Sequence, residues 1–351
     1  MKSRIIRLLL LTVAAFSLWA KTVVPGPRLI VGELLSNVEV KAPLRYENLT
    51  IFPLSGDGPT TTSFLTLEQA IGSGQVLVQE KGSGQVNLVR MQNRGKTYVF
   101  GMAGEIVSGA KQDRMLQDDI LLPPNSGWLD VPVYCTEHGR WHGSSLSFGT
   151  RGQMVAGCVR KAASLTESQT EVWQEVDEAH ARVGCKAPSH AFARVYDDAK
   201  VKERAAPFIE RLQNLVSKYP DAQGVLVAVG SRVLCVDLFG SKGLFRKMWP
   251  KLLRSYVIDA LGEEPEGSFS EYAARRFIRT ATGMEVSKRN TPGAGELYRI
   301  SASNSSGSAL LFMSALVHLD LFPEQKSHLT GPEDEGAPRL EIRRHNSRLR
   351  E

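Results

Sequence analysis

The chain has 351 residues, of which 42% are hydrophobic and 23% are charged, and its formal net charge is +6. This composition is that of an ordinary globular protein and excludes a disordered, collagen-like or disulfide-scaffold chain. Only 7% of the residues are aromatic and no long charge run occurs, which argues against a nucleic-acid groove built on stacked bases. At about 150 residues per domain, the length favours two domains or one large one.

The first twenty residues have the pattern of a secretory signal peptide. Lys2, Arg4 and Arg7 precede a short apolar stretch that ends at Ala20. A charged segment followed by a short apolar run and a small residue is typical of a cleaved export signal. We therefore expect residues 1–20 to be removed and the mature protein to be periplasmic or extracellular, with no membrane span after cleavage. An uncleaved N-terminal anchor is the alternative.

Residues 21–150 alternate between apolar and polar side chains in short runs that are separated by turn residues, as strands do. The runs 77–80 and 86–90 flank the glycine-rich segment 81–84 and predict a β-hairpin. One short helix is expected to begin after Thr66, which is a good N-cap residue. This part of the chain is expected to be strand-rich and sandwich-like, and to carry the site.

Residues 151–322 combine helical periodicity with buried strands. Apolar residues recur at helical spacing in four segments, namely 168–183, 200–219, 244–261 and 270–282. Strands are expected in three segments, namely 224–239 as a pair around a Gly-Ser turn, 297–301 and 309–321. The polar residues 323–351 are expected to form a flexible tail. The predicted fold class is therefore α+β, with a strand-rich, sandwich-like first part and a second part that mixes helices and strands.

Four cysteines follow the predicted leader: Cys135, Cys158, Cys185 and Cys235. An exported protein can form disulfides, and four cysteines allow three pairings. A bridge between Cys158 and Cys185 is conceivable because the two flank an expected helix. Cys235 lies in an apolar run and is expected to be a buried thiol.

The segment from Gly101 to Arg114 is the densest polar stretch, and it lies between two expected strands. Gly104 and Gly109 allow tight backbone paths and the close approach of a ligand. The segment offers two carboxylates, an ammonium group, an amide and a guanidinium, which belong to Glu105 and Asp113, Lys111, Gln112 and Arg114. Such groups suit a phosphorylated or polyhydroxylated small molecule, because Arg and Lys bind phosphate and carboxylates bind hydroxyls. A solvated loop with weak surface ion pairs is the alternative.

A second polar stretch follows another expected strand. It holds a thiol, a carboxylate, two imidazoles, a guanidinium and an indole: Cys135, Glu137, His138, Arg140, Trp141 and His142. Gly139 and Gly143 disfavour the helix that would align the two histidines, so no metal site is predicted. Glu105 and Glu137 are predicted to be catalytic, because two carboxylates in unlike surroundings can divide the acid and base roles.

The ligand is expected to be a small molecule or a sugar rather than a nucleic acid. The residues predicted to bind it are Glu80, Lys111, Gln112, Asp113, Arg114, His138, Arg140 and Trp141. Glu80 ends an expected strand and can point into the same site. Phosphate-loop, dinucleotide-binding and nucleophile-elbow motifs are absent, so the sequence leaves the cofactor unknown.

Three motifs in these segments belong together. They are Asn93-Arg94, Gly104-Glu105-x-x-x-Gly109-x-Lys111-Gln112-x-Arg114, and Val131-Pro132-Val133 leading to Cys135-x-Glu137-x-Gly139-Arg140-Trp141. Their combination resembles a bacterial domain family named for its association with ADP-ribosylglycohydrolase and rhodanese-phosphatase domains. The resemblance covers roughly residues 35–261 and implies a link to the processing of ADP-ribose or related nucleotide sugars. Asp113 stands where the family pattern is expected to have Asn, and its charge is expected to weaken phosphate binding.

Two functions remain open at this point. The first is an exported ligand-processing domain that hydrolyses a nucleotide sugar or a glycoside, with Glu105 and Glu137 as acid and base. The second is a non-catalytic envelope module that binds a sugar, a peptide or another protein. In that module, Arg114 would bridge the two glutamates beneath Trp141 as a structural network. The sequence determines neither whether the chain is an enzyme nor its oligomeric state.

Overall fold

The computed structural model describes residues 26–56, 62–141, 143, 145–263 and 267–324. The predicted signal peptide and residues 325–351 of the predicted tail lie outside these ranges. Within them, the chain forms a nine-stranded sheet, a closed barrel and a three-stranded sheet, together with helices, which confirms the α+β class. Among the described helices, none combines the length and the apolar character needed to cross a membrane.

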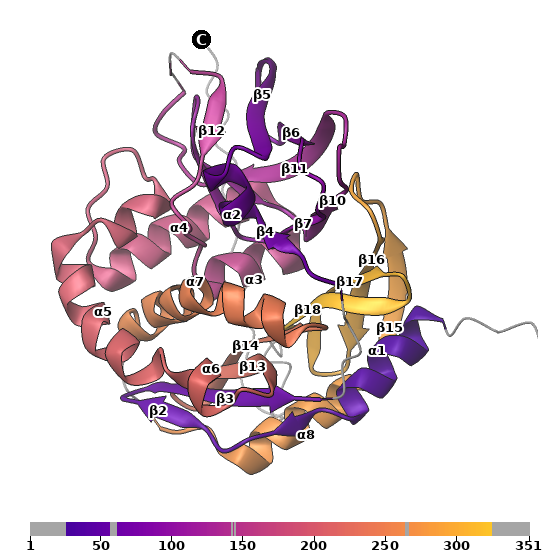
Figure 1. The fold of residues 1–351 in the computed structure, drawn as a ribbon. Coiled ribbons are helices and arrows are strands. Elements are labelled where there is room, and N and C mark those ends of the chain that lie inside the picture. The colour runs from indigo at the N-terminus through magenta and orange to yellow at the C-terminus, as the bar shows by residue number, and fades with distance from the viewer. Residues whose placement is uncertain (1–25, 57–61, 142, 144, 264–266, 325–351) are drawn as a thin grey trace, which may run out of the picture.

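The large sheet takes strands from both ends of the described chain (Figure 1). The N-terminal strands are β1 (Glu39–Val40), β2 (Leu44–Tyr46) and β3 (Leu49–Ser55). The later strands are β13 (Ala222–Val229), β14 (Arg232–Phe239), β15 (Glu285–Arg289), β16 (Glu296–Ala302), β17 (Ser305–Phe312) and β18 (Ala315–Pro323). Their order is β1-β3-β13-β14-β18-β17-β16-β15, with β2 also paired to β3, and all pairs are antiparallel. Because β3 pairs with β13, residues 39–55 complete a sheet that is otherwise built from the second part of the chain.

Helices cover both faces of the large sheet. On one face, α1 (Pro27–Ser36) and α8 (Glu271–Ala281) bury apolar side chains against the strands. The other face is covered by α3 (Gly157–Thr166) and α7 (Lys242–Leu261). Against these two helices pack α4 (Gln169–Val183) and α5 (Ala199–Leu212), with η1 (Phe192–Tyr196) and α6 (Leu215–Lys218) completing the layer. The α7 helix is buried on nearly every side, so it connects the sheet to the rest of the molecule.

The helix boundaries follow capping signals that are visible in the sequence. In α2 (Leu67–Gly72), the Thr66 hydroxyl accepts the Gln69 N–H and the Gln69 side chain accepts the Thr66 N–H. The expected helix 200–219 is divided into α5 and α6, whereas α7 continues through Pro250. Pro250 is exposed, so water can replace the hydrogen bond that its ring removes.

A closed barrel forms the part of the molecule at the top of Figure 1. Its order is β11-β6-β5-β12-β8-β9. The strands are β5 (Val76–Gln85), β6 (Leu88–Asn93), β8 (Ile106–Gly109), β9 (Arg114–Leu116), β11 (Leu129–Cys135) and β12 (Ser147–Gly149). The three-stranded sheet beside it consists of β4 (Leu65–Thr66), β7 (Val99–Gly101) and β10 (Ile120–Leu122). The inward-facing side chains form a separate apolar core.

The predicted hairpin is present as β5 and β6, but its turn lies at Val86–Asn87. The segment 81–84 continues β5, and the register shifts between Glu80 and Gln85. Gly82 and Gly84 adopt positive φ, so β5 can accommodate the residues between Glu80 and Gln85 that have no partner on β6.

All four cysteines are free thiols, so the conceivable bridge between Cys158 and Cys185 is not formed. The side chain of Cys158 instead lies 3.1 Å from Nη2 of Arg182. Cys235 is buried in β14, as its apolar surroundings predicted.

Candidate functional site

The interior of the barrel changes from apolar to polar at one end. Glu80, Arg114 and Cys135 continue the inward-facing rows that valine and leucine occupy on β5, β9 and β11. Arg114 lies opposite Cys135 in the pairing of β9 with β11. All three side chains are buried. The alternation of strand side chains therefore places the ion pair of Glu80 and Arg114 and the thiol of Cys135 at one end of the barrel interior.

Arg114 is the centre of this polar end. Its guanidinium donates a 3.2 Å hydrogen bond to Gln112 and lies 4.0 Å from the carboxylate of Glu80. Its Nε and Nη2 have no hydrogen-bond partner among the described protein atoms. The half-exposed ring of Trp141 covers the guanidinium at 5.6 Å, and Lys111 Nζ lies 5.0 Å from the same ring. A buried cation with spare donors beneath an aromatic ring is suited to recognising an anionic or polar group.

An open pocket of about 410 Å³ adjoins the polar end of the barrel. Its walls come from the end of β8, the turn that follows, the loop after β11, the segment after β12, and η1. This volume is within the usual range of small-molecule sites. The polar residues of the wall include Ser108, Asp113, Glu137, Arg140, Arg151 and Arg194.

Arg140 joins the two carboxylates of the pocket. Its Nη2 lies 2.6 Å from Glu137 Oε2 and 3.6 Å from Asp113 Oδ1, and its Nη1 donates to the carbonyl of Ala110 at 2.9 Å. The Asp113 carboxylate accepts the Gly109 N–H, and the Glu137 carboxylate accepts the Asp113 N–H, each at 3.0 Å. Gly109 has a φ of 120°, a conformation that favours glycine. The turn after β8 therefore brings both acids to one guanidinium.

The pKa values of these two carboxyl groups shift in opposite directions. Burial raises the pKa of Asp113, and the neighbouring charge of Glu137 adds to the effect. Burial alone would also raise the pKa of Glu137, but hydrogen bonds from Arg140, the Asp113 N–H and Ser189 together lower it. The two carboxyl groups therefore lie in unlike surroundings, which is typical of groups that divide the acid and base roles.

Glu105, which the sequence pairs with Glu137, lies in different surroundings. Its buried carboxylate is 3.4 Å from Lys251 Nζ of α7 and accepts the Met102 N–H at 3.4 Å. Burial raises the pKa of Glu105, and Lys251 opposes this shift. Lys251 also pairs with Glu68 of α2 at 3.1 Å. Glu105 thus ties the barrel to α7 and is not part of the pocket wall.

The other predicted residues fall into two adjacent groups. Glu80, Lys111, Gln112, Arg114 and Trp141 form the polar end of the barrel, while Asp113, Glu137 and Arg140 line the pocket. The bridge from Arg114 to Glu105 and Glu137 is not formed; Arg114 instead pairs with Glu80 of β5, a strand that is not adjacent to β9 in the barrel. His138 contacts Asp177 of α4 instead of the pocket. His142 lies outside the described residues.

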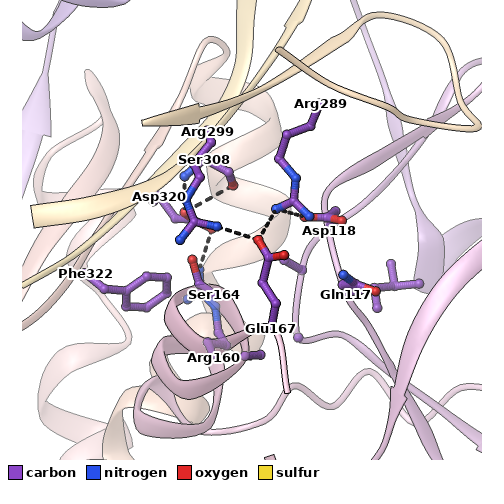
Figure 2. Close-up of a pocket in the computed structure, with 15 residues that line it drawn as sticks. Gln117, Asp118, Arg160, Ser164, Glu167, Arg289, Arg299, Ser308, Asp320 and Phe322 are labelled. Carbon is purple, nitrogen blue, oxygen red and sulfur yellow. Dashed lines mark hydrogen bonds and ion pairs between the residues drawn. The ribbon is translucent and has the colours of Figure 1, made fainter. Parts of the chain in front are cut away.

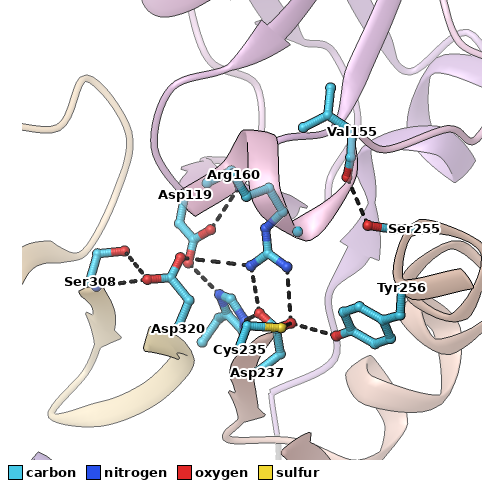
Figure 3. Close-up of polar contacts among 12 residues, drawn as sticks. Asp119, Val155, Arg160, Cys235, Asp237, Ser255, Tyr256, Ser308 and Asp320 are labelled. Carbon is cyan, nitrogen blue, oxygen red and sulfur yellow. Dashed lines mark hydrogen bonds and ion pairs between the residues drawn. The ribbon is translucent and has the colours of Figure 1, made fainter. Parts of the chain in front are cut away.

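A second buried network, which the sequence analysis did not find, joins the loop between β9 and β10 to the large sheet (Figure 3). Asp237 of β14 accepts hydrogen bonds from Arg160 of α3 at 2.6 and 2.9 Å, and from the Tyr256 hydroxyl at 2.5 Å. His318 of β18 lies 2.6 Å from Asp119 and 3.4 Å from Asp237. All five side chains are buried. Asp237 and His318 are flanked by apolar residues in their strands, whereas Asp119 follows Asp118 and Arg160 precedes Lys161, so no shared local pattern marks these residues as a group.

The ionised groups in this network stabilise one another's charged forms. Although burial opposes ionisation, Arg160 and His318 keep the pKa of Asp237 well below its usual range. Asp119 and Asp237 raise the pKa of His318 to about 10, against the effect of burial. These ion pairs lie where α3, β14, β18 and the loop before β10 meet, so their role is to fix that junction.

A small charged cavity lies beside this network (Figure 2). Glu167 pairs with Arg299 at 2.5 Å and with Arg289 at 3.3 Å, and Arg289 also pairs with Asp118 at 3.2 Å. Burial raises the pKa of Asp118 to about 6. The cavity offers about 20 Å³, which is room for one water molecule. It is too small for a substrate. The pocket at the barrel is the candidate site because it has room for a small molecule and contains residues of both polar segments.

The raised pKa of His318 has a consequence for stability. A histidine whose pKa is about 10 in the folded protein and near 6.5 in the unfolded chain stabilises the fold fully below pH 6.5, and this contribution is lost as the pH rises through 10. Urea unfolding of wild type and His318→Asn at pH 6, 8 and 10 should show a free-energy difference that shrinks by an amount on the order of 3 kcal/mol. A difference that is constant over this range would contradict the assignment of a charged His318.

One protein-family model matches residues 37–322 of the chain. The family is described as ARPP-1, the ARG and Rhodanese-Phosphatase-superfamily-associated Protein domain. The match runs from β1 into β18, so it includes the large sheet, the barrel and the pocket. Neither the curated proteins nor the solved structures contain a match to the chain.

Proposed function

The chain belongs to the ARPP-1 family, and on that premise we propose that it hydrolyses a phosphorylated sugar of the nucleotide-sugar class in the pocket at the barrel. The observation that carries this proposal is the pair Asp113 and Glu137. Both carboxylates contact one guanidinium, that of Arg140, in a pocket of suitable size. Their pKa values shift in opposite directions, upward for Asp113 and downward for Glu137, as expected of a proton donor and a proton acceptor.

Each carboxyl group has one role in this reaction. Glu137, whose lowered pKa keeps it ionised, accepts a proton from a water molecule that attacks the glycosidic carbon. Asp113, whose raised pKa favours the protonated form, donates its proton to the leaving oxygen as the carbon–oxygen bond breaks. Arg140 fixes the separation of the two groups. This assignment replaces Glu105 with Asp113 as the partner of Glu137.

The basic residues at the rim of the pocket support a phosphate-bearing substrate. The side chains of Arg151 and Arg194 are 53% and 61% exposed, and both face Asp197, at 2.8 and 3.5 Å. A single carboxylate therefore offsets two cations, and a phosphate can use the remaining donors. Arg140, whose Nη2 lies 3.6 Å from Asp113 Oδ1, offsets the charge that would repel a phosphate.

Export remains part of the proposal. Its support is the charged and apolar pattern of residues 1–20, which lie outside the described ranges.

Ligand binding tests the proposal directly. Isothermal titration with ADP-ribose, AMP, ribose 5-phosphate and ribose should show that the double variant Arg151→Ser/Arg194→Ser binds the phosphorylated compounds more weakly, by roughly tenfold or more. Ribose, which carries no phosphate, should be unaffected. Arg276→Ser on α8 is the matched control, since this exposed arginine belongs to a helix on the opposite face of the large sheet. Equal losses in the control, or no binding of any phosphorylated compound, would contradict the proposal.

A non-catalytic binding module is the second candidate. The observation that favours it is that Arg140 contacts the Ala110 carbonyl as well as both carboxylates. These contacts also stabilise the turn after β8. Under this alternative, the same compounds bind but no product is released.

A further inference from the structure

Three side chains from separate segments meet at the surface of α4, outside the pocket. They are His138 in the loop after β11, Asp177 in α4, and His190 between α4 and η1. The Asp177 carboxylate lies 2.7 Å from His190 Nδ1 and 3.3 Å from His138 Nε2. The two imidazole rings are 4.4 Å apart between centroids. One nitrogen or oxygen atom from each residue lies within 4.8 Å of the others.

This set of atoms has the chemistry and spacing of a zinc site. Two imidazoles and one carboxylate, with a fourth position for water, is a common zinc ligand set. In a tetrahedral site with bonds of about 2.0–2.1 Å, the ligand atoms lie roughly 3.3 Å apart. Measured from one carboxylate oxygen of Asp177, Oδ1, His138 Nε2 lies 3.4 Å away, close to this value, and the 2.7 Å contact with His190 Nδ1 has to lengthen by about half an ångström. The ligand nitrogens of the two histidines lie within 4.8 Å of each other. The side chains of His138, Asp177 and His190 are 31%, 43% and 46% exposed, so water can reach the remaining position.

We propose that His138, Asp177 and His190 bind one zinc ion, which fastens two segments of the pocket wall to α4. His138 follows Glu137, and His190 precedes Ala191; both neighbours line the pocket. The same two segments are already joined by a hydrogen bond from the Gly139 N–H to the Ser189 carbonyl at 3.1 Å. A metal at this position would therefore restrain the backbone on either side of Glu137. The inference does not depend on the proposed hydrolysis.

Zinc binding by the full chain, purified without a histidine tag and treated with a chelator, tests the inference. Competition with a chromophoric zinc chelator should give one bound zinc ion per chain, and the melting temperature should rise with added zinc, because the site is formed only in the folded protein. His138→Gln, Asp177→Asn and His190→Gln should each weaken zinc binding by at least about a hundredfold, since even the loss of an outer-shell partner of a metal ligand costs 10–100-fold. Glu178→Gln, the next residue on α4 and an exposed carboxylate, is the matched control and should bind zinc as wild type does.

The competing interpretation is a chain of hydrogen bonds in which both imidazoles donate to Asp177 and no metal is involved. The far-UV circular dichroism of each variant in the presence of chelator shows that it is folded, so a loss of zinc binding can be assigned to the site. Wild type that binds less than one zinc ion at micromolar concentrations, or variants that all bind like wild type, would overturn the inference. A cobalt(II) absorption spectrum typical of a four-coordinate nitrogen and oxygen site would support it.

Discussion

Replacing Arg160 with methionine is expected to lower the free energy of unfolding by about 3–5 kcal/mol, because it leaves the Asp237 charge buried without its main partner. The Arg160 side chain is 1% exposed, so water cannot take its place. The measurement is equilibrium unfolding in urea at pH 7, followed by circular dichroism. In wild type, Tyr256 and His318 also contact Asp237, so part of the charge remains compensated in the variant.

A matched control and a double-variant cycle separate the buried charge from a general loss of packing. Arg232→Met removes an ion pair with Glu263, but the arginine is 74% exposed, and the cost should be less than about 1 kcal/mol. Asp237→Asn should cost less in the Arg160→Met background than in wild type, because the two groups compensate each other. Equal costs in the two backgrounds would show that the stability at this junction comes from packing alone.

Replacing Glu137 with glutamine is expected to reduce turnover by roughly 10²–10⁴-fold, the usual contribution of general acid–base catalysis. Asp113→Asn should have an effect of similar size through the loss of the proton donor. The two variants differ in pH dependence. Activity of wild type should rise as Glu137 ionises at low pH and fall as Asp113 loses its proton at higher pH. The residual activity of Asp113→Asn should lack the fall on the alkaline side.

The kinetic test requires steady-state release of sugar or nucleotide from ADP-ribose and related compounds. Asp130→Asn is the matched control, since this carboxylate on β11 is exposed and pairs with Lys81 away from the pocket. Turnover that is unchanged in both Glu137→Gln and Asp113→Asn would rule out the proposed chemistry. Loss of turnover in Glu105→Gln alone, without a change in stability, would return the catalytic role to the pairing expected from the sequence.

The polar segments of the candidate site can be recognised in the sequence, but the way in which their side chains meet cannot. The two polar segments were visible because each follows a strand and gathers polar groups within a few residues. Which acid accompanies Glu137 depends on the turn after β8, where Gly109 and Ala110 both adopt positive φ and direct Asp113 toward Arg140. Glu105 precedes that strand, and its carboxylate is directed to Lys251 of α7. No periodicity in the sequence contains this information.

The sequence by itself determined the elements whose signals are local: the capped helices α2 and α4, the strand pair around Gly230, and the α+β class. Only the tertiary structure decided which of these elements meet. The pairing of β3 with β13, the closure of the barrel and the junction of Asp119, Arg160 and His318 join residues that are far apart in the chain. Helix capping and strand alternation depend on a few consecutive residues. The long-range contacts form when several apolar faces are buried together, and the polar residues enclosed among them then pair with one another.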